Sequence, residues 1–320
     1  MERATTEHAL EVKDLVKVFR KRGQEPVRAL DGVSFSVRRG EIFGLLGPNG
    51  AGKSTTLRIL TTLIKPTAGS ATVLGYDVVA HPLEARRQMC VVVQENAIEL
   101  YLSVLNNFRT FGRFHGLSAK EIEERSGWVM ELFGLNDYLN EKGMDLSGGL
   151  KRRVQVAKMF MVDKPLVFLD EATTGMDTFN KRKTIEAIKE ESRKGRTIVL
   201  TTHMLDEAEE LCHSVAIINH GKVIANGSVD EVKSLGLQLF TLTLTFRKIT
   251  RAMLQAINRR KPLKVETRGN SVILTVRDEK SALDILMSAR RIGALQHFEL
   301  DSASLEDVFV ELVDKKASAA

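Results

Sequence analysis

The chain has 320 residues, of which 43% are hydrophobic and 28% are charged, and its formal net charge is +6. A chain of this length is expected to form about two domains, and so small a basic excess does not indicate a nucleic-acid partner. Its two cysteines, Cys90 and Cys212, form no C-x-x-C motif, and nowhere do about 18 apolar residues run together. We therefore expect no zinc or thiol redox site, no membrane span, and a reducing cytoplasmic compartment.

Strands and helices alternate over the first two thirds of the chain. Three strands are predicted near its start, over residues 9–19, 27–37 and 41–47. The third is apolar almost throughout, which is typical of a strand buried on both faces. From 165 to 227, short apolar strands again alternate with helical segments. This pattern predicts a largely parallel sheet with helices on its faces.

Helices are predicted between these strand regions. One should run over 54–64 and stop before Pro66. Residues 83–140 carry mainly helical patterns, and Ser118 with Glu121 has the spacing of a capping box.

A second domain is indicated after residue 236. Residues 237–300 read in the order strand, helix, strand, strand, helix, strand, with the hairpin turn "RGN" at 268–270 and a last helix over 304–313. This βαββαβ order is that of ferredoxin-like folds. We expect an α/β domain over 8–232 and a small α+β ferredoxin-like domain over 237–314, the latter in a dimer-supporting or regulatory role.

A phosphate-binding loop follows the third strand. Its sequence GPNGAGKST matches the pattern G-x-x-x-x-G-K-[ST], between a predicted strand and a predicted helix. Its glycines let backbone N–H groups converge on phosphate oxygens, and the helix N-terminus adds its positive end. Lys53 can reach the β- and γ-phosphates, and Ser54 can ligate Mg²⁺, so ATP and Mg²⁺ are expected. The candidate nucleotide-binding residues are Gly47, Pro48, Asn49, Gly50, Ala51, Gly52, Lys53, Ser54 and Thr55.

Two acids end the apolar strand "PLVFLDE" at 165–171. Asp170 at the strand end can hold Mg²⁺ directly or through water. Glu171 points elsewhere and can act as a general base on the attacking water.

A second glycine-bearing helix start lies about a hundred residues after the phosphate loop, in "LSGGLKRRVQVAKM" at 146–159. Lys151, Arg152 and Arg153 follow in its first turns, at the end of a helix that prefers anions. We expect either a surface that faces a triphosphate or, for Lys151 and Arg152, a plain solvated face.

The chain resembles ABC-type ATPase domains over residues 8–232. Five motifs occur in the family's order and rough spacing: the phosphate loop, "LSGG" at 146–149, "VFLDE", "TTGMD" at 173–177 and "TTH" at 201–203. The resemblance implies a P-loop NTPase fold with a helical subdomain over about 97–160, and hydrolysis of ATP to ADP and phosphate.

The same resemblance implies roles for further residues. Phe19 would stack on adenine, although a core aromatic remains the alternative. Gln94 would contact Mg²⁺ and the attacking water, His203 would hold the γ-phosphate, and Asp177 would couple two sites across a dimer.

The family pattern also implies a partner chain. Ser147, Gly148 and Gly149 would close over the ATP of a second ATPase subunit, for which we expect a second copy of this chain. Three positions depart from the pattern and bear on fine tuning of the site, not on ATP binding: Leu150, Ala172 and Met176.

A narrower likeness is to the daunorubicin-resistance type of ABC-2 exporter subunit. It rests on "GYDVVAHPLEARRQ", "FGRFHGL" and "SLEDVFVELV". It implies a separately encoded membrane-spanning permease, attachment to the cytoplasmic face of the membrane through it, and export of a drug, antibiotic, lipid or similar compound. The alternative is a non-transport ABC ATPase that acts as a regulatory factor.

Overall fold

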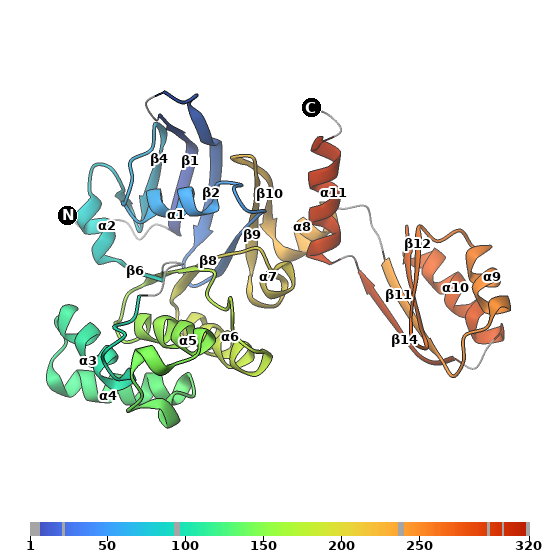
Figure 1. Cartoon of the computed structure of the whole chain (residues 1–320). Helices are drawn as coiled ribbons and strands as arrows, with labels where there is room; N and C mark the ends of the chain where they lie inside the picture. Colours follow the sequence, from blue (N-terminus) through green and yellow to red (C-terminus); the bar gives the residue numbers. More distant parts are fainter. Residues whose placement is uncertain are drawn as a thin grey trace. The chain divides into compact units, whose positions relative to one another are not determined.

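The computed structural model describes residues 7–20, 23–92, 97–235, 240–292, 295–302 and 304–317. The chain divides into two compact units, Met1–Asn226 and Gly227–Ala320 (Figure 1). Each unit has its own hydrophobic core. No helix in these described ranges combines the length and the apolarity needed to cross a membrane.

The main sheet of the first unit has six strands in the order β10-β9-β3-β8-β7-β6. β3 pairs in parallel with β8 and β9, and β7 pairs in parallel with β6 and β8. Every residue of β3, β7 and β8 is buried, which confirms the sheet type expected from their apolar sequences. The strands are β3 (Ile42–Leu46), β6 (Met89–Val92), β7 (Leu166–Asp170), β8 (Thr197–Thr202), β9 (Ser214–Asn219) and β10 (Lys222–Ser228).

An antiparallel sheet in the order β2-β1-β4-β5 completes the strands of this unit. Phe35 of β2 stacks on Phe43 of β3 with ring centroids 5.1 Å apart, so the two sheets share one core. The strands are β1 (His8–Phe19), β2 (Val27–Arg38), β4 (Ala68–Val73) and β5 (Tyr76–Asp77).

Helix α1 (Lys53–Leu60) is shorter than the predicted helix. Thr62 adopts a left-handed backbone with φ of 63°, and the N–H groups of Leu63 and Ile64 both donate to the Arg58 carbonyl oxygen. This local closure ends the helix well before Pro66.

The helical region was predicted in outline, but the short strands around it were not. The capping box at the start of α4 is confirmed, with Ser118 N–H donating to Glu121 at 2.8 Å and Glu121 N–H to Ser118 Oγ at 3.3 Å. Strand β6 interrupts the expected helical run, because four apolar residues have no periodicity that separates strand from helix. The helices are α2 (Pro82–Arg87), α3 (Val104–Phe114), α4 (Ala119–Leu132) and α5 (Gly148–Met159).

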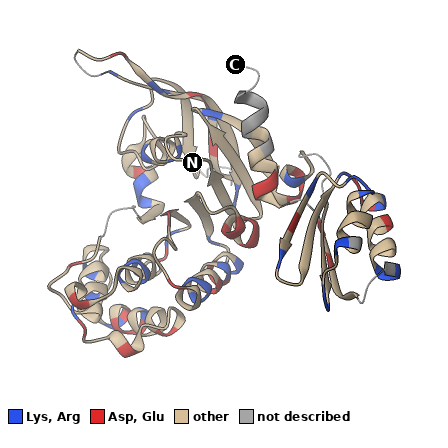
Figure 2. Cartoon of the chain, turned by 45° about the vertical axis from the view of Figure 1, so that its right-hand side comes forward, with Lys and Arg blue, Asp and Glu red and all other residues tan. Residues whose placement is uncertain are grey.

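Two further helices, α6 (Thr178–Arg193) and α7 (Leu205–Leu211), are joined by opposite charges. α7 carries four acidic residues, drawn red in Figure 2. Lys189 of α6 lies 3.1 Å from Glu210, and Lys181 lies 3.8 Å from both Asp206 and the buried Glu207.

The second unit contains the predicted βαββαβ order. Its sheet is antiparallel, in the order β12-β13-β11-β14, so β13 splits the β11-α9-β12 unit as in ferredoxin-like folds. The elements are α8 (Val229–Leu235), β11 (Phe240–Phe246), α9 (Arg251–Asn258), β12 (Lys264–Arg268), β13 (Ser271–Val276), α10 (Glu279–Ile292), β14 (Leu295–Ser302) and α11 (Leu305–Ala317).

Candidate functional site

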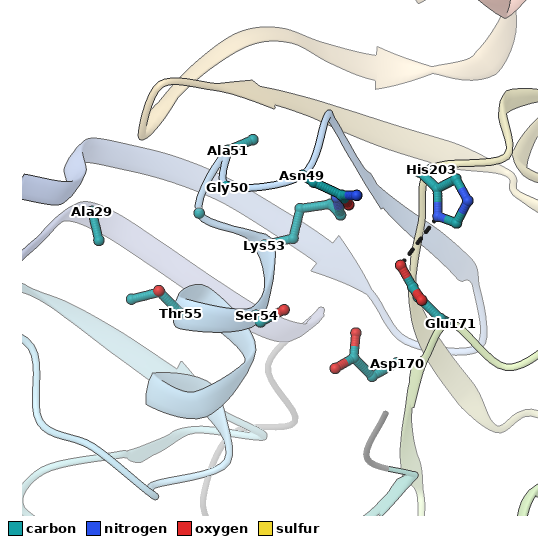
Figure 3. A pocket seen from close by; sticks show the side chains of 11 residues that line it. Ala29, Asn49, Gly50, Ala51, Lys53, Ser54, Thr55, Asp170, Glu171 and His203 are labelled. Atoms are coloured by element: carbon teal, nitrogen blue, oxygen red, sulfur yellow. Dashed lines mark hydrogen bonds and ion pairs between the residues drawn. The ribbon is translucent and has the colours of Figure 1, made fainter. Parts of the chain in front are cut away.

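A cavity of about 400 Å³ lies where β3, β7 and β8 end (Figure 3). The carboxyl ends of parallel strands meet at one edge of a sheet, so the loops that follow these strands converge there. The cavity is lined by residues of the phosphate loop, by one residue of β2 and by three polar side chains: Ala29, Asn49, Gly50, Ala51, Gly52, Lys53, Ser54, Thr55, Asp170, Glu171 and His203.

The phosphate loop needs its glycines for space as well as conformation. A Cβ at Gly47, where φ is 151°, would lie 2.1 Å from the carbonyl oxygen of Ile218. At Gly52, where φ is 116°, it would lie 2.9 Å from the carbonyl oxygen of Ala29. The loop is therefore pressed against β9 and β2, which leaves its open side toward the cavity.

Lys53 is held inside this loop. Its ammonium donates to the carbonyl oxygens of Gly47 at 2.6 Å and Pro48 at 3.1 Å. Burial lowers the pKa of Lys53, and the charges of Glu171 and Asp170 oppose that shift. Helix α1 begins at this point without a side-chain cap and without an acid in its first turn. A cation and an uncapped helix N-terminus at one wall are groups that can bind phosphate.

The two acids at the end of β7 face different partners. Asp170 is buried, and its carboxylate accepts a hydrogen bond from the Thr201 hydroxyl. Glu171 has a left-handed backbone with φ of 52°, and its N–H donates to the Thr201 carbonyl oxygen at 3.0 Å. Its carboxylate Oε1 lies 3.1 Å from Nδ1 of His203, as the dashed line in Figure 3 marks. Thr201 therefore supports both acids, a role the sequence did not reveal.

The residues predicted to serve a second chain do not line this cavity. Ser147 caps α5, accepting from the Leu150 N–H at 3.2 Å, and it is exposed together with Gly148. Gly149 packs against Gly175 and Met176 in the loop before α6. Asp177 caps α6, accepting from the Asn180 N–H at 2.9 Å, and is also exposed.

Of the three cations that follow Gly149, two do not lie on the exposed surface that we expected. Arg152 and Arg153 are buried, so they form neither a solvated face nor a surface toward a triphosphate. Arg152 donates to the backbone carbonyls of Asp170 and Glu171, and Arg153 donates to Asn180. The reason is that α5 packs against α3, α4, α6 and β6, which leaves its charged side chains enclosed. Lys151 is half-buried and donates to the Met144 carbonyl oxygen at 3.2 Å.

Two predicted residues, Phe19 and Gln94, are not among the residues described as lining the cavity. Phe19 is 41% exposed at the end of β1, where Lys17 lies 5.2 Å from its ring centroid, so the core-aromatic alternative is wrong. Phe19 does not line the cavity. Gln94 lies outside the described residues.

A parallel sheet whose buried strand β3 leads into a phosphate loop, with two acids at the end of β7 and a separate helical region, defines an ABC-type P-loop ATPase. Residues 30–174 match the family model of the ABC transporter, and residues 227–313 match that of the ATP-binding protein DrrA1-3-like, C-terminal domain.

Relatives match along nearly the whole chain. It is 34% identical over 313 residues to the daunorubicin/doxorubicin resistance ATP-binding protein DrrA of Streptomyces peucetius, covering 97% of this chain and 93% of that protein. It is 35% identical over 306 residues to the Nod factor export ATP-binding protein I of Ralstonia nicotianae, covering 94% of each.

Solved structures share the fold of the ATPase unit. One is an ATP-binding subunit of an ABC transporter, with a TM-score of 0.64 and 32% identity over 71% of this chain and 92% of the other. Another is a dimeric ATP-binding cassette bound to ADP and Pi, with a TM-score of 0.63 and 25% identity over 68% of this chain and 98% of the other.

The chain therefore belongs to the ABC transporter family and is an ATP-binding, ATP-hydrolysing subunit with a DrrA-like C-terminal domain. This agrees with the expected transporter subunit and not with the non-transport alternative.

Proposed function

We propose that this chain powers an ABC-2 type exporter, hydrolysing ATP to drive efflux through a separately encoded membrane-spanning permease at the cytoplasmic face of the membrane. The observation that carries the proposal is the cavity where Lys53, Glu171 and His203 meet. The relatives are named for drug resistance and for Nod factor export, so a drug, antibiotic, lipid or similar compound is the proposed cargo class.

The phosphate loop is the proposed seat of the ATP triphosphate. Residues 49–55 of the loop and of the start of α1 line the cavity, so the loop N–H groups, the helix N-terminus and Lys53 are the proposed phosphate contacts. The exposed ring of Phe19 is proposed to stack on the adenine, outside the walls described above.

Mg²⁺ fits the donor set beside this loop. The Ser54 hydroxyl and the Asp170 carboxylate both line the cavity and offer the hard oxygen ligands that this ion prefers. Gln94 is proposed as a third contact, as the family pattern implies. When bound, the ion would neutralise phosphate charge as the leaving oxygen departs.

Glu171 is the proposed general base. One carboxylate oxygen lies against His203, and the other can accept the proton of a water that attacks the γ-phosphorus.

The contact between Glu171 and Nδ1 of His203 also limits how His203 can bind phosphate. If Nδ1 carries the hydrogen that Glu171 accepts, Nε2 can donate to the γ-phosphate only in the doubly protonated ring. A neutral His203 must instead release Glu171 before it holds the phosphate.

A second copy of the chain is proposed to complete each site. Ser147 and Gly148 are exposed at the start of α5, and neither lines the cavity of its own chain. The free N–H groups of this helix start suit the γ-phosphate of a partner's ATP. Asp177, also exposed, is proposed to couple the two sites across the dimer.

The permease is proposed to dock on the helical region. Leu100, Tyr101 and Met144 are exposed apolar side chains, and the Met144 N–H donates to the Leu100 carbonyl oxygen at 2.8 Å, so they lie together. Tyr101 is 82% exposed. An apolar patch of this kind marks a protein interaction site.

Transport into inverted membrane vesicles tests the proposal. The chain would be co-expressed with a multi-spanning protein encoded next to it, and uptake of doxorubicin into inverted vesicles would be followed by fluorescence. We expect ATP-dependent uptake that is lost with Glu171→Gln and with Tyr101→Asp. Uptake that persists with Glu171→Gln would contradict the proposed coupling to hydrolysis.

A further inference from the structure

Arg152 joins helix α5 to the backbone of Asp170 and Glu171. It lies on α5 and is only 5% exposed. Its Nε and Nη2 donate to the Glu171 carbonyl oxygen at 3.2 Å and 3.0 Å, and Nη2 also donates to the Asp170 carbonyl oxygen. Nη1 donates to Gln155 Oε1 at 3.0 Å, which fixes the other side of the guanidinium.

The segment that Arg152 holds is strained. Glu171 has φ of 52°, a left-handed conformation that costs free energy for any residue with a Cβ. Such a conformation persists only where the surroundings over-determine it. On one side the Glu171 N–H donates to Thr201, and on the other its carbonyl accepts from Arg152 and, at 3.3 Å, from the Thr174 N–H. Arg152 is the side chain among these partners, so the direction of the Glu171 carboxylate depends in part on the guanidinium.

We propose that Arg152 is a positioning residue for ATP hydrolysis, holding the Glu171 backbone in its left-handed conformation so that the carboxylate faces the cavity of the same chain. This rests on the proposed role of Glu171 as general base. Arg152 does not line the cavity and acts through Glu171.

Arg152 lies on the same helix as Ser147, the residue proposed to contact the partner's ATP. It lies five residues after Ser147, about 7.5 Å along the helix axis. The N-terminus of α5 is proposed to contact the nucleotide of the partner chain. Helix α5 thus links two sites. Ser147 at its start is proposed to contact the partner's ATP, and Arg152 holds the backbone of Glu171, the proposed general base of the same chain.

The substitution Arg152→Lys separates geometry from charge. Lysine keeps the positive charge but has no planar fork to reach two carbonyls and Gln155 together. We expect kcat for ATP hydrolysis to fall at least about tenfold, as misplaced catalytic groups do, while KM and the affinity for a fluorescent ATP analogue stay within about twofold. Arg125→Lys is the matched control, because Arg125 also donates to a backbone carbonyl, that of Met161 at 3.3 Å, away from the cavity.

Mixed dimers distinguish positioning from a general folding role. A small amount of active chain is assayed in about tenfold excess of inactive chain, so that mass action places most active chains in mixed dimers. The reference pairs wild-type chain with excess Glu171→Gln. In one arm the active chain carries Arg152→Lys; in the other only the inactive Glu171→Gln chain carries it.

We expect the rate per active chain to fall about tenfold in the first arm and to match the reference in the second, because Arg152 serves the Glu171 of its own chain. Equal loss in both arms, or no loss in the first, would overturn the proposal. If the Glu171→Gln chain alone hydrolyses ATP like the wild type, the proposed general base fails instead.

Discussion

Gly149 lies so close to Gly175 that a Cβ on Gly149 would come within 2.6 Å of the Gly175 carbonyl oxygen. The start of α5 thus packs directly on the loop that leads to Asp177. We expect Gly149→Ala to lower the unfolding free energy by about 1–3 kcal/mol, because backbone atoms must move to admit the methyl group.

Gly148→Ala is the control, because a Cβ at Gly148 meets nothing within 4 Å. We expect it to change the unfolding free energy by no more than about 1 kcal/mol, in the stabilising direction, since alanine favours helices. Urea unfolding of the nucleotide-free chain measures both, and equal destabilisation would refute the packing explanation.

Leu150 departs from the family pattern without removing a contact of the helix start. The side chain is 7% exposed, and the interaction at Ser147 is made by the Leu150 backbone N–H, which any residue but proline retains. We expect Leu150→Gln to keep ATP binding and to change kcat by less than about tenfold. Steady-state phosphate release measures this, and complete loss of turnover would show that the side chain itself is required.

The fold and the wall of the cavity could be predicted from sequence because they depend on local pattern. The phosphate loop has a fixed spacing, and β3, β7 and β8 are apolar runs that end at candidate site residues. Arg152 and Arg153 could not be placed, because a charged residue near a helix start is usually solvated and only tertiary packing encloses it. The support of Asp170 by Thr201 joins neighbouring strands that no spacing rule connects. Phe19 could not be assigned as core or exposed, because alternation does not show which end of a strand is covered.

Glu207 should make stability depend on pH. It is buried, and burial raises the pKa of its carboxyl above the ordinary 4.5, while the Thr173 hydroxyl at 2.6 Å and the charge of Lys181 oppose that shift. The unfolded chain has the ordinary pKa of 4.5, and the folded chain has a higher one. Between the two, the folded chain binds more protons than the unfolded chain. The contribution of Glu207 to stability is therefore present below pH 4.5 and is lost as pH rises through the folded pKa.

Glu207→Gln removes this ionisation and keeps an amide oxygen that can accept from Thr173. We expect the unfolding free energy of the variant, relative to wild type, to increase from about pH 5 to about pH 8. Thermal or urea unfolding over this range measures it. A difference that stays flat or decreases with pH would mean that Glu207 is not held toward its neutral form.

The proposed second chain is tested at Ser147. Ser147→Arg places a long cation where the partner's ATP is proposed to lie, so we expect hydrolysis to fall by about 100-fold or more while ATP still binds the chain's own phosphate loop. Ser118→Arg makes the same change at the cap of α4 and controls for the lost cap. Full activity of Ser147→Arg, or of a chain shown to be monomeric during turnover, would contradict a site shared by two chains.

The most direct test of the central claim is ATP hydrolysis by Glu171→Gln, measured beside ATP binding on the same preparation. The substitution removes the proposed base but leaves Asp170, Ser54 and Lys53 at the cavity wall. The account predicts ATP affinity within about threefold of wild type and phosphate release below about 1% of the wild-type rate. Phosphate release at the wild-type rate would show that Glu171 is not the general base.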